Sequence, residues 1–256
     1  MINREIKIFL TAVLFFTRIP CPSWVNHSEE DLNSSSKYLP LIGIIIGGLT
    51  GLAFCGARLI FGLSISLILS MICSVLLTGA FHEDGLADMC DGFGGGWTKD
   101  KILSIMKDSQ IGTFGAISLI FILAVKFLAL NQSPEYIIIP ILITGNSTSR
   151  WFAISFLFFL PYARQTGDSK SKAFSTKITL PILLFSGILG FTPMLILGFW
   201  THTFQILWII PVLSLITFLL GRMFTKWIGG FTGDCLGGTQ QITEVIFYLG
   251  CVAVYH

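Results

Sequence analysis

The stretch Phe81–Gly96, FHEDGLADMCDGFGGG, follows directly on a long apolar segment and carries four carboxylates within nine residues. They are Glu83, Asp84, Asp88 and Asp91. Four carboxylates at the edge of a membrane repel one another, and ionisable groups there are costly unless they have a function. The stretch therefore predicts a site for a cation at the end of a membrane-embedded helix. The alternative is that some of these carboxylates are ordinary surface residues.

Composition places the chain among membrane proteins. Of its 256 residues, 53% are hydrophobic and only 12% are charged, and the mean hydropathy is +0.79. These values lie outside the range of soluble globular domains. The formal net charge of +2 gives no indication of a nucleic-acid partner. We expect an all-α, polytopic integral membrane helix bundle that forms a single catalytic domain over residues 1–256.

Seven stretches approach the length of about 20 apolar residues that a membrane-spanning helix needs. The N-terminal stretch 6–16 is too short to span, so we expect it to lie in the interface or to re-enter the membrane. The predicted spans are residues 39–61, 64–82, 111–130, 136–160, 178–199, 205–222 and 241–256.

Basic residues divide the connections between these spans into two kinds. The connections near 62–63, 131–135 and 200–204 carry no lysine or arginine, whereas the N-terminal segment and the other connections carry all but three of the 16. Because cytoplasmic loops are enriched in lysine and arginine, the basic side is predicted to be cytoplasmic. The acidic stretch then opens to the cytoplasm.

The carboxylates share one face if the predicted helix 64–82 continues as far as Asp91. Asp84, Asp88 and Asp91 then lie at i, i+4 and i+7 on one stripe. Glu83 lies about 100° to one side of that stripe. Hard oxygen ligands in this arrangement suit Mg²⁺, with Mn²⁺ as the alternative, because such ions take one or two carboxylates and fill their remaining positions with water and substrate phosphate.

Other polar residues near this stretch are candidates for the same site. The glycines that follow Asp91 allow backbone amides to approach an anion, as in an anion-binding nest. Together with Lys107, they indicate a pyrophosphate, because metal and lysine both neutralise phosphoryl oxygens. Asp108 and Asp234 are expected to complete or flank the metal site. His82 is a candidate base or hydrogen-bond partner of a ligand, and a buried core histidine is the alternative.

Arg150 lies inside the predicted span 136–160, directly after the polar run 144–149. An arginine within a membrane indicates a function and a partner, which we expect to be substrate phosphate or one of the acidic residues. Structural ion pairing is the alternative. Arg58 and Lys126 lie near the outer ends of their helices, where we expect their side chains to snorkel to the membrane surface.

Four segments also match patterns of a known family. They are TRIP at 17–20, HEDGLAD with DGFGGG at 82–96, IMKDSQIGTFG at 105–115 and GGFTGDCLGG at 229–238. In these segments the chain resembles cobalamin synthase, the adenosylcobinamide-GDP ribazoletransferase family. The resemblance extends from near the N-terminus to the last predicted span.

The resemblance implies a magnesium-dependent enzyme of the late cobamide pathway in the bacterial inner (cytoplasmic) membrane, with its active site facing the cytoplasm. It implies a phosphoryl transfer that joins adenosylcobinamide-GDP to α-ribazole or α-ribazole 5′-phosphate and releases GMP. In that reaction the ribose 3′-hydroxyl attacks the phosphorus on the aminopropanol arm. Such chemistry relies on positioning and charge neutralisation. A homo-oligomer, or association with other late enzymes of the pathway, is compatible with this assignment.

The expected roles follow from the two lines of reasoning together. Glu83, Asp84, Asp88 and Asp91 form the metal-binding set, and Asp108 and His82 are the catalytic candidates. The candidates for substrate contact are Arg18, Gly94, Gly95, Gly96, Lys107, Ser109, Arg150, Arg164 and Asp234.

Two other classes of protein share some of these features. A cation- or proton-coupled transporter would also place carboxylates and an arginine among membrane helices, but its acidic residues should lie near the middle of the bilayer. A non-catalytic membrane scaffold would explain the hydrophobicity and leave the acidic stretch without a purpose. The grouping of carboxylates at one edge favours the enzyme.

Overall fold

The computed structural model describes residues 4–25, 29–164 and 177–255. This part of the chain is helical and contains no strand, which confirms the all-α prediction. The α-helices are α1 (Arg4–Phe16), α2 (Glu29–Ser35), α3 (Leu39–Arg58), α4 (Leu63–Thr78), α5 (Phe81–Gly95), α6 (Lys99–Ile105), α7 (Thr113–Gln132), α8 (Ile138–Phe159), α9 (Leu180–Thr201), α10 (Ile209–Ile228) and α11 (Gly233–Tyr255).

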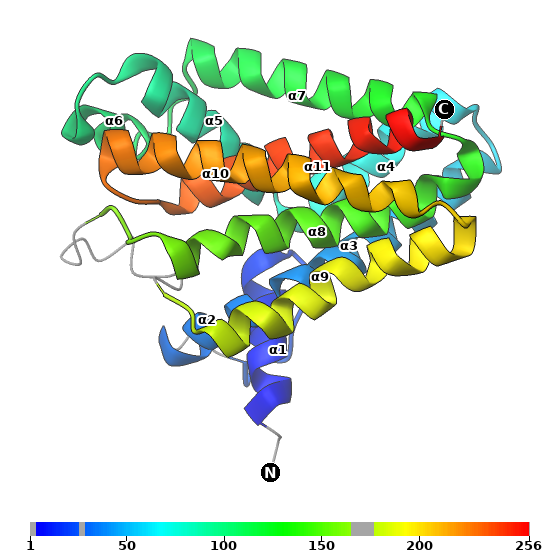
Figure 1. The fold of residues 1–256 in the computed structure, drawn as a ribbon, viewed down its shortest axis with the longest axis horizontal. Coiled ribbons are helices and arrows are strands. Elements are labelled where there is room, and N and C mark those ends of the chain that lie inside the picture. The colour runs from blue at the N-terminus through cyan, green and yellow to red at the C-terminus, as the bar shows by residue number, and fades with distance from the viewer. Residues whose placement is uncertain (1–3, 26–28, 165–176, 256) are drawn as a thin grey trace.

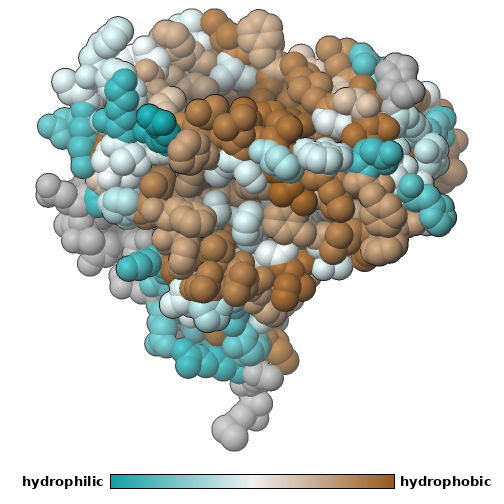
Figure 2. Space-filling view, in the orientation of Figure 1, coloured by the Kyte–Doolittle hydropathy of each residue, from teal (hydrophilic) through white to brown (hydrophobic). Residues whose placement is uncertain are grey.

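The long helices lie side by side, with α8 packed against α3, α9 and α11 (Figure 1). The helix α1 runs across the bundle rather than along it (Figure 1), which agrees with the expectation that this short segment does not span the membrane. Hydrophobic residues cover the middle of the face formed by α8, α9 and α10, and hydrophilic residues gather towards its ends (Figure 2). This distribution is typical of a protein embedded in a bilayer.

Four helical segments are long and apolar enough to cross a membrane individually. They are Glu30–Arg58, Thr113–Gln132, Leu180–Thr201 and Phe204–Ile228. The helices α4 and α5 reach the required length and hydropathy only when they are taken together as a bent pair. The described chain therefore has four possible spans, or five if this pair counts as one. The expected count of seven is not established. Two of the expected spans, α8 and α11, are long enough but carry many polar residues, which lie buried inside the bundle.

The predicted continuation of the helix 64–82 into the acidic stretch is wrong. The helix α4 ends at Thr78, and α5 begins at Phe81 at an angle of 86° to it. Gly79 and Ala80 separate the two helices, and both adopt left-handed backbone conformations (φ 65° and 58°). A left-handed glycine satisfies the last carbonyls of a helix and stops it. We therefore treat α5, with its four carboxylates, as lying outside the apolar spans.

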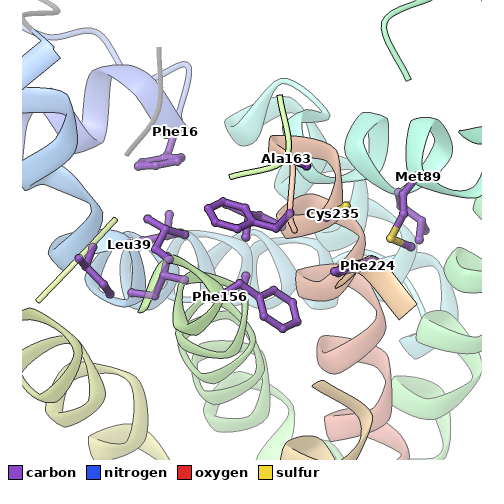
Figure 3. Close-up of a cluster of buried hydrophobic side chains, with 14 of the residues drawn as sticks. Phe16, Leu39, Met89, Phe156, Ala163, Phe224 and Cys235 are labelled. Atoms are coloured by element: carbon purple, nitrogen blue, oxygen red, sulfur yellow. The ribbon is translucent and has the colours of Figure 1, made fainter. Parts of the chain in front are cut away.

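Buried side chains tie α5 to the rest of the bundle. Figure 3 shows part of one cluster, in which Met89 of α5 lies near Cys235 of α11 and Phe224 of α10. The same cluster includes Phe156 of α8 and Phe16 of α1 (Figure 3). Lipid is as apolar as these side chains, so close packing rather than exclusion from water stabilises such contacts within a membrane.

Two loops pair at one end of the bundle and carry polar residues with them. The amide of Ala163 donates to the carbonyl of Phe231 at 2.8 Å, and the amide of Phe231 donates to the carbonyl of Pro161 at 3.0 Å. The last helix follows this pairing and begins at Gly233, not at 241 as predicted. Its start is capped by Thr232, whose hydroxyl accepts a hydrogen bond from the amide of Cys235 at 3.3 Å.

Replacement of Gly230 by alanine should weaken this loop pairing. A Cβ at position 230 would collide with the carbonyl oxygen of Pro161, and that atom cannot yield without breaking the paired backbone. We expect Gly230→Ala to destabilise the protein by about 1–3 kcal/mol, measured as a lower melting temperature in detergent. Gly233→Ala is the matched control, because a Cβ there meets open space. Equal melting temperatures for the two variants would contradict the role of the pairing.

Candidate active site at the α5–α11 contact

The site is built where the backbones of α5 and α11 touch. A Cβ on Gly85 would lie 3.1 Å from the Cα of Gly237, and a Cβ on Gly237 would lie 3.1 Å from the Cα of Gly85. Beside this backbone contact, the side chain of Met89 packs against Gly238. Glycines at these positions allow the two helices to approach until their backbones are in contact. The start of α11 is thereby brought beside the acidic face of α5.

Three carboxylates gather at this contact. Asp84 and Asp88 come from successive turns of α5, and Asp234 comes from the first turn of α11. Asp84 is exposed and the other two are partly buried. Burial, together with the negative charges of Asp234 and Asp84, raises the pKa of Asp88 to about 7. The group thus carries unfavourable like-charge repulsion, which a bound cation would relieve.

Arg164 brings a positive charge to the same place. Its Nη2 donates to Oδ2 of Asp234 at 2.7 Å, and the hydroxyl of Thr232 donates to the same oxygen at 3.2 Å. The Nε of Arg164 is buried and has no hydrogen-bond partner in the described part of the chain. A partly buried guanidinium with an unused donor is suited to binding an additional anion, such as a phosphate oxygen.

The protein alone does not form a complete metal cage. Within the described residues, no three histidine, cysteine, aspartate or glutamate side chains are arranged to hold an ion. A site with too few protein ligands to enclose an ion is compatible with Mg²⁺. This ion commonly binds one or two carboxylates and completes its coordination shell with water and substrate phosphate. The donor chemistry of Asp84, Asp88 and Asp234 therefore fits a magnesium ion that is shared with a substrate.

Asp91 has a structural role that the sequence did not suggest. Its two carboxylate oxygens accept hydrogen bonds from the amides of Gly112, at 2.7 Å, and Gly115, at 2.9 Å. These amides belong to the N-terminus of α7, where donors lack partners within the helix and a negative charge is favourable. Asp91 is on the predicted stripe, but its oxygens hold α7 in place against α5.

The glycines that end α5 accommodate side chains rather than an anion. A Cβ on Gly94 would collide with the ring of Phe114, and one on Gly96 would lie 2.6 Å from Ile102. Gly94 and Gly95 are helical, and the amide of Gly96 donates to the carbonyl of Gly92 at 2.9 Å. The prediction of an anion-binding nest here is wrong, because these amides are used within the helix and the C-terminal end of a helix disfavours a negative charge.

The connection between α6 and α7 holds three of the predicted site residues. Lys107, Asp108 and Ser109 are all exposed there. Oδ1 of Asp108 accepts a hydrogen bond from the amide of Gln110 at 3.1 Å. Its described contacts do not include the carboxylates of α5.

Arg18 lies at the bend between α4 and α5. Its amide donates to the carbonyl of Leu77 at 2.7 Å, and its guanidinium lies directly against Gly79, where a Cβ would collide with it. The described contacts of this arginine therefore support the bend and do not reach the carboxylates of α5.

A second polar cluster lies inside the bundle. Lys126 of α7 forms an ion pair with Glu244 of α11, with Nζ and Oε1 3.2 Å apart, and donates to Oε1 of Gln241 at 3.1 Å. Gln241 in turn donates to Oε1 of Glu83 at 3.0 Å. Lys126 is 7% exposed, so the expectation that it snorkels to the surface is wrong. Arg58 instead pairs with Glu135 at the surface.

Arg150 belongs to this buried cluster. It is 2% exposed and its Nη1 donates to both oxygens of Asn146, at 2.9 and 2.7 Å. The negative charges of Glu244 and Glu83 act on it, and its Nε is buried without a hydrogen-bond partner among the described residues. His82 is also buried and feels the positive charges of Arg150 and Lys126. His82, which was predicted as a base, thus lies in the interior. This position agrees with the alternative that it is a buried core histidine.

The cluster contains residues that the sequence analysis did not single out. Glu244 accepts hydrogen bonds from Tyr248 at 2.8 Å and from Gln240 at 2.7 Å, in addition to its ion pair. A glutamate flanked by polar residues in the last predicted span was the available signal, because ionisable groups within a membrane are rare. Besides these two residues of its own helix, Glu244 binds Lys126 of α7 and accepts a hydrogen bond from Asn146 of α8 at 3.5 Å, and only the fold brings these helices together.

Fold and site together define a polytopic membrane protein whose acidic groups and arginine converge at one end of a helix bundle, the arrangement of a membrane-embedded enzyme that handles a charged substrate. The family described as cobalamin-5-phosphate synthase matches residues 8–252. The chain belongs to this family.

Relatives named adenosylcobinamide-GDP ribazoletransferase match over almost the full length. The protein of Vibrio parahaemolyticus is 42% identical, with 98% of this chain and 94% of the relative covered. The protein of Shewanella frigidimarina is 43% identical, with coverage of 98% and 96%, and that of Leptospira interrogans is 43% identical, with coverage of 97% and 96%. No solved structure matches the chain.

Replacement of Asp91 by asparagine should weaken the attachment of α7. The asparagine has a similar shape but turns an amide group towards one of the two backbone donors, and it loses the charge that favours the helix N-terminus. We expect a loss of about 1–2 kcal/mol, seen as a lower melting temperature in detergent. Asp100→Asn is the matched control, since Asp100 is exposed on α6. An unchanged melting temperature for Asp91→Asn would contradict the capping role.

The stability of the protein should depend on both residues of the buried ion pair, Lys126 and Glu244. Lys126→Met leaves the carboxylate of Glu244 buried without its cation, which typically costs about 3–5 kcal/mol. The double variant Lys126→Met/Glu244→Gln removes both charges and should recover part of that loss. The measurement is the melting temperature of each purified variant in detergent. A double variant that is less stable than Lys126→Met would contradict the pairing.

Proposed function

We propose that this chain is an adenosylcobinamide-GDP ribazoletransferase, as its relatives are named. The reaction joins adenosylcobinamide-GDP to α-ribazole or its 5′-phosphate. A new bond forms between the ribose 3′-oxygen and the phosphorus on the aminopropanol arm, and the bond from that phosphorus to the oxygen of the departing GMP breaks. The observation that carries this proposal is the convergence of Asp84, Asp88, Asp234 and Arg164 at the α5–α11 contact, in a chain that matches the family from end to end.

We propose that Asp84 and Asp88 hold a magnesium ion, with Mn²⁺ as the alternative, and that Asp234 flanks it. When bound, such an ion neutralises phosphoryl oxygens and stabilises the leaving phosphate. The repulsion among these three carboxylates supports the assignment. Asp91 and Glu83 are left out of the proposed set, because both oxygens of Asp91 accept hydrogen bonds from the start of α7, and Glu83 is buried with its Oε1 bound by Gln241 of the interior cluster.

Arg164 is proposed to bind the pyrophosphate of the substrate. Asp234 holds one end of its guanidinium, which fixes the direction of the remaining donors. The pairing of the loops at Pro161 and Phe231 keeps both residues on one rigid support. A positive group held in advance stabilises charge on the transferred phosphoryl group without having to reorganise.

Asp108 is proposed to accept the proton of the attacking 3′-hydroxyl. Its carboxylate is exposed, and one of its oxygens is bound by the backbone of Gln110. The other oxygen is available to a substrate.

The site is proposed to face the cytoplasm of a bacterial inner membrane. Basic residues are typical of cytoplasmic loops. The segments near the site that link the long helices carry Arg164, Lys107 and the lysines of the short helix α6. A nucleotide-bearing substrate such as adenosylcobinamide-GDP would reach the site from that side.

A transporter is the rival class, and one observation bears on it. The buried cluster places Glu83 and Glu244 inside the bundle, as a transporter would. There they are matched by two cations, Lys126 and Arg150, so the cluster is neutral overall. The adjoining cavity offers about 20 Å³, roughly the space of one water molecule. These features favour a structural role for the cluster.

The proposed metal ligands should be required for turnover. Asp84→Asn and Asp88→Asn remove ligand charge, and we expect each to lower the rate by about 100-fold or more while membrane insertion and the melting temperature stay unchanged. The measurement is GMP release and formation of the coupled cobamide by purified protein in liposomes with Mg²⁺, adenosylcobinamide-GDP and α-ribazole 5′-phosphate.

Asp100→Asn serves as the matched control and should retain the wild-type rate. Wild-type rates in both Asp84→Asn and Asp88→Asn would reject the ligand assignment. A folded wild-type protein that releases no GMP under these conditions would reject the enzymatic proposal itself.

A further inference from the structure

A groove of about 720 Å³ runs between α8 and α10, away from the α5–α11 contact. Its walls are largely aromatic, with Trp151, Phe156 and Phe159 from α8 and Phe218 from α10. Phe159 and Phe218 are 66% and 59% exposed, so the groove opens on the hydrophobic face of the bundle (Figure 2). A groove on this face is in contact with the acyl chains of the membrane.

One end of the groove is positively charged. Arg222 and Lys226, one turn apart on α10, line it together with Leu160 at the end of α8. None of the described residues that line the groove is acidic. Each cation lies over an aromatic ring of its own helix, Phe218 and Trp227 respectively, and neither pairs with a carboxylate in the described part of the chain. The two charges thus have no counter-ion among the residues that the structure describes.

A polar group without a partner lies deeper in the groove. The side chain of Thr217 is 7% exposed, and its hydroxyl forms no hydrogen bond among the described residues. Such a group in apolar surroundings is costly unless a ligand supplies an acceptor. Thr217 precedes Arg222 by five residues, which is about 7.5 Å along the helix axis. A ligand whose phosphate lies at Arg222 would therefore have Thr217 beside the polar groups that follow the phosphate.

We propose that this groove binds one anionic phospholipid of the cytoplasmic leaflet. The phosphate lies between Arg222 and Lys226, an ester carbonyl accepts a hydrogen bond from Thr217, and an acyl chain fills the aromatic part of the groove. Two cations that pair with no described carboxylate, at the end of an apolar groove, favour an anionic headgroup over a zwitterionic one. The proposal goes beyond the transferase activity and does not depend on it.

The test measures lipid retention by native mass spectrometry of the delipidated full-length protein in detergent. Phosphatidylglycerol and phosphatidylcholine with identical acyl chains are offered in equal amounts. We expect preferential retention of one phosphatidylglycerol molecule, and a loss of about fivefold in that preference for each cation removed. Arg222→Gln/Lys226→Gln should therefore abolish the preference, whereas Arg222→Lys/Lys226→Arg should keep it.

Matched variants distinguish lipid binding in the groove from general effects of net charge and of misfolding. Arg4→Gln/Lys101→Gln removes the same net charge from exposed positions elsewhere and should keep the preference. Ser214→Phe fills the groove from an exposed position and should reduce retention of both lipids. Thr217→Val keeps the shape of the side chain but removes the donor, and should weaken retention of phosphatidylglycerol. The melting temperature of each variant establishes that it is folded.

Three results would overturn the proposal. Equal retention of the two lipids by the wild-type protein would show that the basic end is not selective. Displacement of the lipid by glycerol 3-phosphate at similar concentration would indicate a site for a free anion. A concentration-dependent dimer that excludes lipid and is disrupted by Ser214→Phe would show that the groove is an interface between two copies of this chain.

Discussion

The close contact between α5 and α11 is the interaction on which the site depends. Without side chains at Gly85 and Gly237, the two backbones touch, and the first turn of α11 lies beside the acidic face of α5. The turn of 86° between α4 and α5 at Gly79 and Ala80 sets the direction in which α5 meets α11. A left-handed alanine is unfavourable, and such conformations persist where the surrounding structure requires them and are common at functional sites. The bend at Gly79 and Ala80 and the contact between α5 and α11 therefore together set the position of α5.

The carboxylates of α5 serve three different purposes because a helix presents its residues in different directions. Asp84 and Asp88 lie close enough to Asp234 for their negative charges to interact. Asp91, one turn further, accepts hydrogen bonds from the start of α7. Glu83 points into the bundle and joins the cluster around Lys126 and Glu244. The same short helix thus forms the candidate site, anchors α7 and connects both to the buried charges.

The buried cluster shows how polar helices are accommodated inside a membrane protein. The helices α8 and α11 carry Arg150, Asn146, Gln240 and Glu244 on faces that are covered by their neighbours. Within hydrocarbon, each unpaired polar group is costly, so these side chains bind one another. The more apolar α7, α9 and α10 have a larger exposed share, and α9 and α10 contribute to the hydrophobic face seen in Figure 2. A helix can therefore lie at the centre of the bundle although its polar residues make it less hydrophobic than an ordinary membrane-spanning helix.

The sequence by itself determined the class of the fold, the approximate position of most of the long helices and the segment that carries the site. Composition, apolar length and the motif at 82–96 are local properties, and local properties are readable from a chain. It also indicated Asp234 and Arg164, from segments distant along the chain. Only the tertiary structure decided which carboxylates meet. Whether Asp91 binds a metal or caps α7 depends on where Gly112 and Gly115 lie, and whether Lys126 reaches the surface depends on Glu244 of another helix. Both outcomes are set by contacts between residues far apart in sequence, which helical periodicity cannot specify.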